Sequence, residues 1–128
     1  MAPGGDPNGA RPDAAHNIDG IQSILPDLLK IRAGTRHFVL GFVSDKDVNK
    51  ILSLFPQKGI YFWCSPNIPR GKPAEETMKA GKSHGLIGDF YPSVMTAYKA
   101  ALHQSAKNDL VFVGGSSYVV GDFLAATH

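Results

Sequence analysis

The chain has 128 residues, of which 43% are hydrophobic and 19% charged, a composition typical of one soluble globular domain. Its formal net charge of +2, without a dense Lys/Arg stripe, argues against a nucleic-acid partner. The lone Cys64 excludes an internal disulfide, no apolar run reaches the roughly 18 residues of a membrane helix, and no signal peptide is visible, so we expect a cytoplasmic protein.

The N-terminal part of the sequence divides into a leader and a first helix. Residues 1–12 are rich in Gly, Pro, Asp and Asn and lack apolar periodicity, which predicts a disordered leader before a domain spanning residues 13–128. An apolar stripe at helical spacing then predicts a helix that starts near Asp19. Because Pro26 lies inside this stripe, we expect the helix to be kinked or split into two short pieces.

Beyond the first helix, apolar strands alternate with amphipathic helices. Strand-length apolar runs cover residues 37–43, 60–64, 87–91 and 110–113. Each run is followed by a predicted helix with its own start or stop signals. The first has Val48, Ile51, Leu52 and Phe55 on one face, the second runs from Pro73 to a stop at Gly85, Ser93 caps the third, and the fourth spans Tyr118 to about Ala126.

This alternation of strand and helix, four times over, is typical of an α/β fold. We expect a mostly parallel, Rossmann-like sheet with helices on both faces. Ligands of such sheets bind beyond the carboxyl ends of the strands. The loops of interest are therefore residues 13–19, 44–47, 65–72 and 114–118.

Two of these loops carry polar groups suited to a nucleotide. Asp13 can accept both hydroxyls of a ribose, while His16 and Asn17 can bond a phosphate or carboxylate near the positive end of a helix. Residues of these types are also common in turns and caps, so a structural role stays open. The segment Gly41–Asp47, which includes Lys46, has the same two interpretations, and its chemistry alone favours a capped helix with solvated charges.

The third constellation lies between the last strand and the last helix. Two glycines at positions 114 and 115 permit close backbone approach, and the hydroxyls of Ser116 and Ser117 can then bind an anion. A plain tight turn explains the same residues equally well.

Several other motifs are assigned to structure. Gly81-Lys82-Ser83 resembles the end of a phosphate-binding loop, but Glu76 stands where that pattern needs glycine, so we place it in a helix. The histidines have no metal-ligand spacing with one another or with Cys64, and no metal site is predicted. Cys64 itself lies in an apolar strand and is expected in the core.

Taken together, four segments resemble the folylpolyglutamate synthase/dihydrofolate synthase family, in order and at matching spacing. Residues 13–20 (DAAHNIDG) are similar to its D-x-A-H-N-x-x-G segment, and residues 41–47 (GFVSDKD) to its G-x-x-x-D-K-D segment. Residues 68–76 resemble its P-R-A…E-E stretch, and residues 112–119 (FVGGSSYV) its closing F-x-G-S-x-Y segment. The wider Mur ligase superfamily shares this C-terminal domain, so the resemblance implies a Mur-ligase-type C-terminal α/β domain.

The resemblance also implies an activity for the whole enzyme. ATP phosphorylates a folate or dihydropteroate carboxylate, and the amine of glutamate attacks the acyl phosphate. By position, Asp13 would hold the ribose, His16 would act near the phosphates or glutamate, and Ser116 would contact glutamate. Tyr118 would support that pocket. Asn17, Lys46 and Asp47 would contact the cofactor, and Arg70 the substrate.

The sequence departs from the family in two ways. It has no G-x-x-x-x-G-K-[ST] loop, so ATP and Mg²⁺ would be held mainly by a missing N-terminal P-loop ATPase domain. The family also has an apolar strand directly before D-x-A-H-N, whereas residues 7–12 read PNGARP, which cannot form an interior strand. We therefore expect the first strand to be missing or damaged.

Three functional interpretations remain open from sequence. The first is a ligase domain that is inactive without its partner domain. The second is a stand-alone, non-catalytic nucleotide-binding or regulatory α/β module. The third is a fragment without function, which a cooperative melt would argue against.

Overall fold

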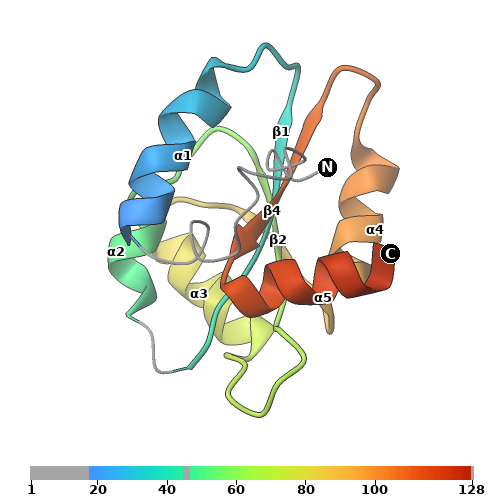
Figure 1. The fold of residues 1–128 in the computed structure, drawn as a ribbon. Helices are drawn as coiled ribbons and strands as arrows, with labels where there is room; N and C mark the ends of the chain where they lie inside the picture. Colours follow the sequence, from blue (N-terminus) through green and yellow to red (C-terminus); the bar gives the residue numbers. More distant parts are fainter. Residues whose placement is uncertain (1–17, 45–46, 128) are drawn as a thin grey trace.

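The computed structural model describes residues 18–44 and 47–127, which form strands and helices in alternation (Figure 1). The helix α1 comes first and is followed by four strand–helix pairs, as the sequence predicted. The elements are α1 (Ile18–Lys30), β1 (Arg36–Gly41), α2 (Val48–Leu52), β2 (Ile60–Trp63), α3 (Ala74–Ser83), β3 (Gly88–Phe90), α4 (Val94–Gln104), β4 (Leu110–Gly115) and α5 (Ser117–Thr127).

Within the described residues, the sheet has four strands in the order β3-β2-β1-β4, and every neighbouring pair is parallel. The longest pairing joins β1 to β4, from Arg36 opposite Leu110 to Gly41 opposite Gly115. The predicted parallel, Rossmann-like sheet is thus confirmed. Because the strands are parallel, their carboxyl ends meet at one edge of the sheet and their amino ends at the other.

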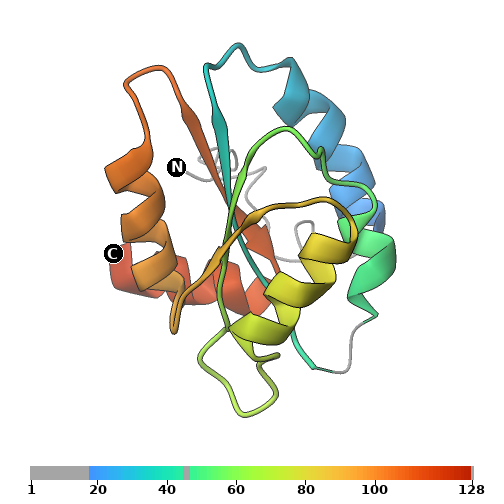
Figure 2. The ribbon, with the colours of Figure 1, turned by 180° about the vertical axis from the view of Figure 1, so that it is seen from behind.

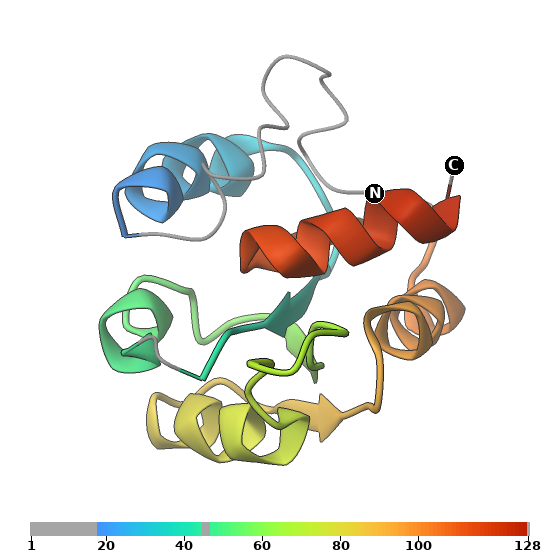
Figure 3. The same cartoon turned by 60° about the horizontal axis from the view of Figure 1, so that its bottom comes forward.

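Helices cover both faces of this sheet, with α1, α2 and α3 on one side and α4 and α5 on the other (Figures 1, 2 and 3). Phe38, Val39 and Leu40 of β1 are all fully buried. Because side chains alternate along a strand, Phe38 and Leu40 pack on one face of the sheet and Val39 on the other. Each face therefore has its own hydrophobic cluster. The first is centred on Phe38, Leu40, Phe55, Tyr61 and Trp63, and the second on Val39, Phe62, Val113, Val119 and Phe123.

Capping residues that were predicted from the sequence fix the start of α4 and the end of α3. The side chain of Ser93 accepts the Thr96 N–H at the start of α4, and Thr96 returns a bond to the backbone of Ser93. At the end of α3, Gly85 has a φ of 78° and its N–H donates to the Lys82 carbonyl. This left-handed residue stops the helix, which confirms the predicted role of Gly85.

Two local predictions are narrowed or corrected by the structure. Helix α1 is a single helix of 13 residues that contains Pro26, so of the two expected alternatives, a kink or a split, the split does not occur. Helix α2 ends at Leu52, before Phe55, because the chain tightens there into turns in which the Leu54 and Phe55 N–H groups donate three residues back. Phe55 is nevertheless buried in the core, as its apolar pattern predicted.

The segment that resembles the end of a phosphate loop lies in α3, as predicted, and packing explains its glycine. A Cβ atom on Gly81 would overlap the indole ring of Trp63. Trp63 in turn stacks on Tyr61, with ring centroids 5.2 Å apart. Gly81 therefore lets α3 lie close against β2.

The predicted leader, residues 1–12, and the place of the expected first strand lie outside the described residues. Within residues 18–44 and 47–127, no helix is both long enough and apolar enough to span a membrane.

Candidate site at the carboxyl ends of the strands

Three strands approach closely at the carboxyl edge of the sheet. Gly41 ends β1 opposite Gly115 of β4, and a Cβ on Gly41 would lie 2.7 Å from the carbonyl oxygen of Cys64. Gly115 has a φ of 100°, and a Cβ there would lie 2.5 Å from the carbonyl oxygen of Gly41. Both glycines are needed for this approach, because a side chain at either position would separate the strand ends.

The turn after Gly115 carries Ser116, the residue predicted to contact glutamate, and leads to Tyr118. Ser116 is only 5% exposed, and its hydroxyl accepts the Tyr118 N–H at 3.1 Å. The Ser116 carbonyl accepts the Val119 N–H at 3.0 Å, which opens α5. Ser116 therefore caps a helix N-terminus, where the helix dipole favours negative charge.

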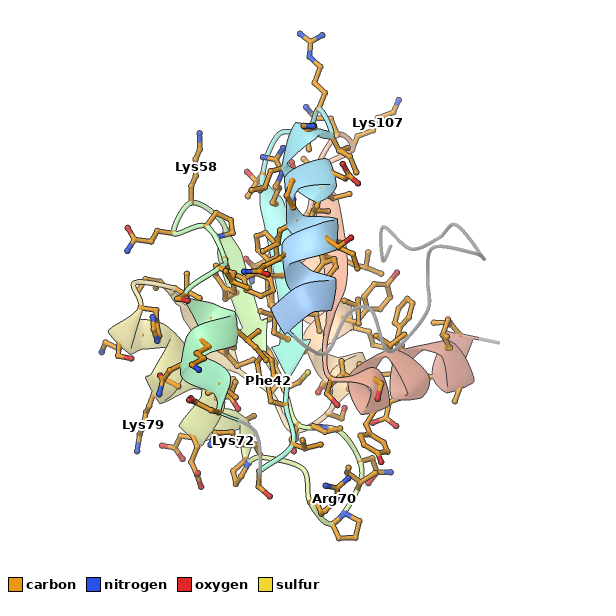
Figure 4. The ribbon with its side chains drawn as sticks, turned by 60° about the vertical axis from the view of Figure 1, so that its left-hand side comes forward. Phe42, Lys58, Arg70, Lys72, Lys79 and Lys107 are labelled. Atoms are coloured by element: carbon orange, nitrogen blue, oxygen red, sulfur yellow. The ribbon has the colours of Figure 1, made fainter. Side chains whose placement is uncertain are left out.

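The loop formed by residues 65–72 crosses the end of β1. The Ser44 N–H donates to the Arg70 carbonyl at 2.7 Å, and the Lys72 N–H donates to the Phe42 carbonyl at 2.8 Å. Between these two bonds Gly71 forms an antiparallel bridge with Val43. Figure 4 shows Arg70 and Lys72 at this end of the molecule, with Lys58 and Lys107 at the opposite end.

Arg70 and Tyr118 meet beside this crossing, although they are 48 residues apart in sequence. An Arg70 guanidinium N–H donates to the Tyr118 hydroxyl at 3.3 Å, and the guanidinium carbon lies 5.7 Å from the centre of the Tyr118 ring. The Tyr118 side chain is 43% exposed. A guanidinium at a surface ring can still bind a carboxylate, which it recognises with paired N–H groups.

The remaining predicted site residues fall into two groups. Asp47 is exposed and accepts the Asn49 N–H at 3.1 Å, so it caps α2 in the way that its chemistry alone favoured. Asp13, His16, Asn17 and Lys46 lie outside the described residues. The structure thus brings Arg70, Ser116 and Tyr118 to one edge and leaves the four others unplaced.

Burial makes Cys64 an unsuitable nucleophile. The side chain is fully buried and donates to the Leu40 carbonyl at 3.4 Å. Burial first, and the charge of Asp122 second, raise the pKa of the Cys64 thiol to about 12. Only the thiolate is reactive, so Cys64 is a core residue, as predicted.

Asp122 is a neighbour of this site that the sequence reasoning missed. Its carboxylate accepts the Asn67 N–H at 2.7 Å, which joins α5 to the loop of residues 65–72. The spacing of Tyr118 and Asp122, four residues apart on one helix face, was visible in the sequence. The partner, a backbone N–H 55 residues away, was not.

A shallow depression of about 350 Å³ lies beside Asp122, towards α4, and none of the predicted site residues lines it. Its polar side chains Ser93 and Asp122 are already bonded within the protein. Among the described residues no group of three His, Cys, Asp or Glu side chains could hold a metal ion.

The sequence of this chain is similar to those of known proteins. The family model described as "Mur ligase, glutamate ligase domain" matches residues 8–117. A dihydrofolate synthase/folylpolyglutamate synthase of Buchnera aphidicola subsp. Schizaphis graminum is 25% identical over 114 residues, which are 88% of this chain and 27% of that protein.

Two solved structures show the same fold over nearly the whole chain. The bifunctional folylpolyglutamate synthase/dihydrofolate synthase of Yersinia pestis, complexed with AMPPNP and Mn, is 26% identical with a TM-score of 0.76, covering 89% of this chain and 27% of its own. E. coli FolC, in complex with DHPP and ADP, is 23% identical with a TM-score of 0.78, covering 88% and 27% respectively. The chain thus spans little more than a quarter of these relatives.

Proposed function

The chain belongs to the Mur ligase glutamate ligase domain family, and from that premise we propose that it is the C-terminal domain of an ATP-dependent ligase that adds glutamate to a folate or dihydropteroate carboxylate. The observation that carries the proposal is the meeting of Arg70 and Tyr118 beside the helix start at Ser116. A further likeness supports it, since the structure of a bifunctional folylpolyglutamate synthase/dihydrofolate synthase with Mn, AMPPNP and L-glutamate bound is 26% identical, with a TM-score of 0.76.

Within this proposal the described residues handle glutamate. Arg70 binds a glutamate carboxylate, because its guanidinium matches a carboxylate with parallel N–H groups. Ser116 contacts the same substrate at the positive end of α5, and Tyr118 supports the pocket by holding the Arg70 side chain. Together they orient the amine for attack on an activated carboxylate, and orientation of this kind contributes strongly to the rate of such a reaction.

The nucleotide side of the proposal rests on the resemblance, and all of its residues except Asp47 lie outside the described part. Asp13 holds the ribose of ATP, His16 lies near the phosphates or glutamate, and Asn17, Lys46 and Asp47 contact the cofactor. ATP supplies the phosphoryl group that activates the carboxylate. The partner is an N-terminal P-loop ATPase domain, which holds most of the ATP and the Mg²⁺, and the coverage of 27% of the relatives' length fits such a division.

A domain exchange tests this function. Residues 13–128 replace the matching C-terminal part of the Yersinia enzyme, and ADP release is measured with and without L-glutamate in the presence of dihydropteroate or a reduced folate. We expect glutamate-dependent ADP release from the chimera and none from the 128-residue chain alone. Turnover by the isolated chain would contradict the need for a partner domain.

Substitutions of two basic residues in the chimera test whether Arg70 binds glutamate. Arg70→Ala in the chimera is expected to raise the KM for glutamate at least about tenfold, since a charged hydrogen-bonded contact is lost. Lys107→Ala is the matched control, because Lys107 lies at the opposite end of the molecule (Figure 4). A folded chimera without glutamate-dependent turnover, combined with ATP binding by the chain that Asp13→Ala abolishes, would favour the nucleotide-binding module instead.

A further inference from the structure

The loop of residues 65–72 carries Arg70 and is attached to the described structure at its middle and at its far end. Its far end is held by the bonds of Arg70 and Lys72 to the end of β1. Its middle contains Pro66 and Pro69, which have no N–H to donate. The Ile68 N–H bonds only within the loop, to the Pro66 carbonyl at 2.8 Å.

One bond joins the middle of this loop to another element of the described structure. The Asn67 N–H donates to Oδ2 of Asp122 on α5 at 2.7 Å. Asn67 is exposed, so packing does little to hold it there. A bond from a backbone N–H to a carboxylate is short and stronger than a neutral one.

Helix α5 therefore contacts the loop at two places on one face. The Tyr118 hydroxyl accepts a hydrogen bond from the Arg70 side chain. The Asp122 carboxylate, one helical turn further along α5, accepts a hydrogen bond from the Asn67 backbone N–H. The same helix begins directly after Ser116. The helix thereby links the loop to the turn that carries the other proposed substrate contacts.

We propose that Asp122 is a positioning residue, whose carboxylate holds the loop of residues 65–72 against α5 and so keeps Arg70 on Tyr118 for the substrate carboxylate. The geometry of this tether is a property of the chain itself. Its consequence for catalysis rests on the proposed function. Asp122 does not touch substrate in this scheme and acts only through Arg70.

The first experiment uses the full chain without ligand, so that it judges the tether alone. Amide hydrogen exchange is measured by NMR at Asn67 and, as an internal reference, at Lys72. NOE contacts between the Arg70 side chain and the Tyr118 ring are recorded in the same samples. The variants are Asp122→Ala, which removes the acceptor, and Asp122→Asn, which keeps an oxygen that can accept the Asn67 N–H. Asp27→Ala on the exposed side of α1 is the control.

In Asp122→Ala we expect exchange at Asn67 to rise about tenfold and the Arg70–Tyr118 contacts to weaken, with the Lys72 rate unchanged. Asp122→Asn should restore much of both signals, and Asp27→Ala should change neither. Unchanged exchange at Asn67 would overturn the tether. Faster exchange with intact Arg70–Tyr118 contacts would overturn the positioning role. If Asp122→Ala does not fold, Asp122→Asn decides, because neutralising the acceptor should still loosen Asn67 measurably.

The second experiment places the same variants in the chimera with the Yersinia enzyme. A positioning role predicts that Asp122→Ala raises the KM for glutamate about tenfold while kcat stays within about twofold. A merely structural role would instead lower the melting midpoint and reduce activity at every glutamate concentration. A chimera that is inactive with native Asp122 would count against the proposed function, whereas the ligand-free exchange data would still decide the tether.

Discussion

The two edges of the sheet use polar residues in opposite ways. At the amino edge, the Asp109 carboxylate accepts the N–H groups of Thr35 and Ala106, each at 2.9 Å, and its Oδ2 lies 2.9 Å from Nε2 of His37. His37 is 1% exposed, so this network is closed to solvent on one side. At the carboxyl edge, Arg70 and Tyr118 lie at the surface; the Arg70 carbonyl accepts the Ser44 N–H, and the Tyr118 N–H donates to the Ser116 hydroxyl.

This difference separates polar groups that join two loops inside the fold from polar groups that lie at the surface. At the amino edge, the bonds of Asp109 to Thr35, His37 and Ala106 join residues 34–37 to residues 106–110. At the carboxyl edge, backbone bonds fix the loop of residues 65–72 on β1, and the Arg70 guanidinium is placed on Tyr118 at the surface. We therefore expect substitutions at the amino edge to change stability and those at the carboxyl edge to change ligand binding. Gly115 is the exception, because it lies at the carboxyl edge but its substitution should change stability.

That exception is Gly115, where we expect the largest loss of stability. Its φ of 100° and the carbonyl oxygen of Gly41 leave no room for a Cβ. Gly115→Ala should lower the free energy of unfolding by about 3 kcal/mol, measured by urea denaturation. Gly121→Ala is the matched control, since a Cβ there meets nothing within 4 Å and alanine favours a helix by about 0.5–1 kcal/mol. Equal effects of the two substitutions would contradict the strained geometry.

An intermediate effect is expected at the amino edge, and it depends on pH. The N–H of Ala106, then His37, then the N–H of Thr35 lower the pKa of Asp109 from 3.8 to about 2. A lowered carboxyl pKa stabilises the folded chain above pH 4, and this contribution is lost as the pH falls from about 4 to about 2. Asp109→Asn should therefore be less stable than the native chain at pH 7, and the gap should narrow at pH 2. A gap that is constant between these pH values would contradict the ionised network.

The smallest change in stability is expected for Tyr118→Phe. This substitution removes the hydroxyl that accepts the Arg70 N–H but leaves the ring beneath the guanidinium. Because the side chain is exposed, the free energy of unfolding should change by no more than about 0.5 kcal/mol. In the chimera the KM for glutamate should nevertheless rise several-fold.

Tyr98→Phe is the matched control for that substitution. The Tyr98 ring packs edge-on against Phe123, with centroids 4.7 Å apart, on the face of α4 that meets α5. It should leave both stability and the KM for glutamate nearly unchanged. If Tyr118→Phe lowers the free energy of unfolding as much as a core substitution does, the interpretation of Tyr118 as a surface residue of the carboxyl edge is contradicted.

Much of the architecture was predictable because its signals are local. Apolar runs such as residues 110–113, caps such as Ser93 and stops such as Gly85 each act within a few residues, and the structure confirms all three. The same holds for the parallel class of the sheet, which follows from strand and helix alternating along the chain. The candidate site was predicted at the level of loops for this reason: the carboxyl ends of parallel strands must share an edge.

The partners of individual side chains were not predictable, because they join segments far apart in sequence. His37 was seen only as a residue without metal spacing, and its contact with Asp109 lies 72 positions away. The sequence left a kink or a split of α1 at Pro26 open because propensity describes an isolated helix, whereas α1 stays in one piece with Leu25 and Leu28 buried in the core.

The sequence by itself therefore determined the order and kind of the elements, the buried stripe of each and the loops that reach the carboxyl edge. Only the tertiary structure decided the strand order β3-β2-β1-β4, the burial of His37 and the attachment of Asn67 to Asp122. The physical reason is range: periodicity, caps and turns depend on neighbouring residues, but a contact across 55 positions exists only once packing brings two elements together.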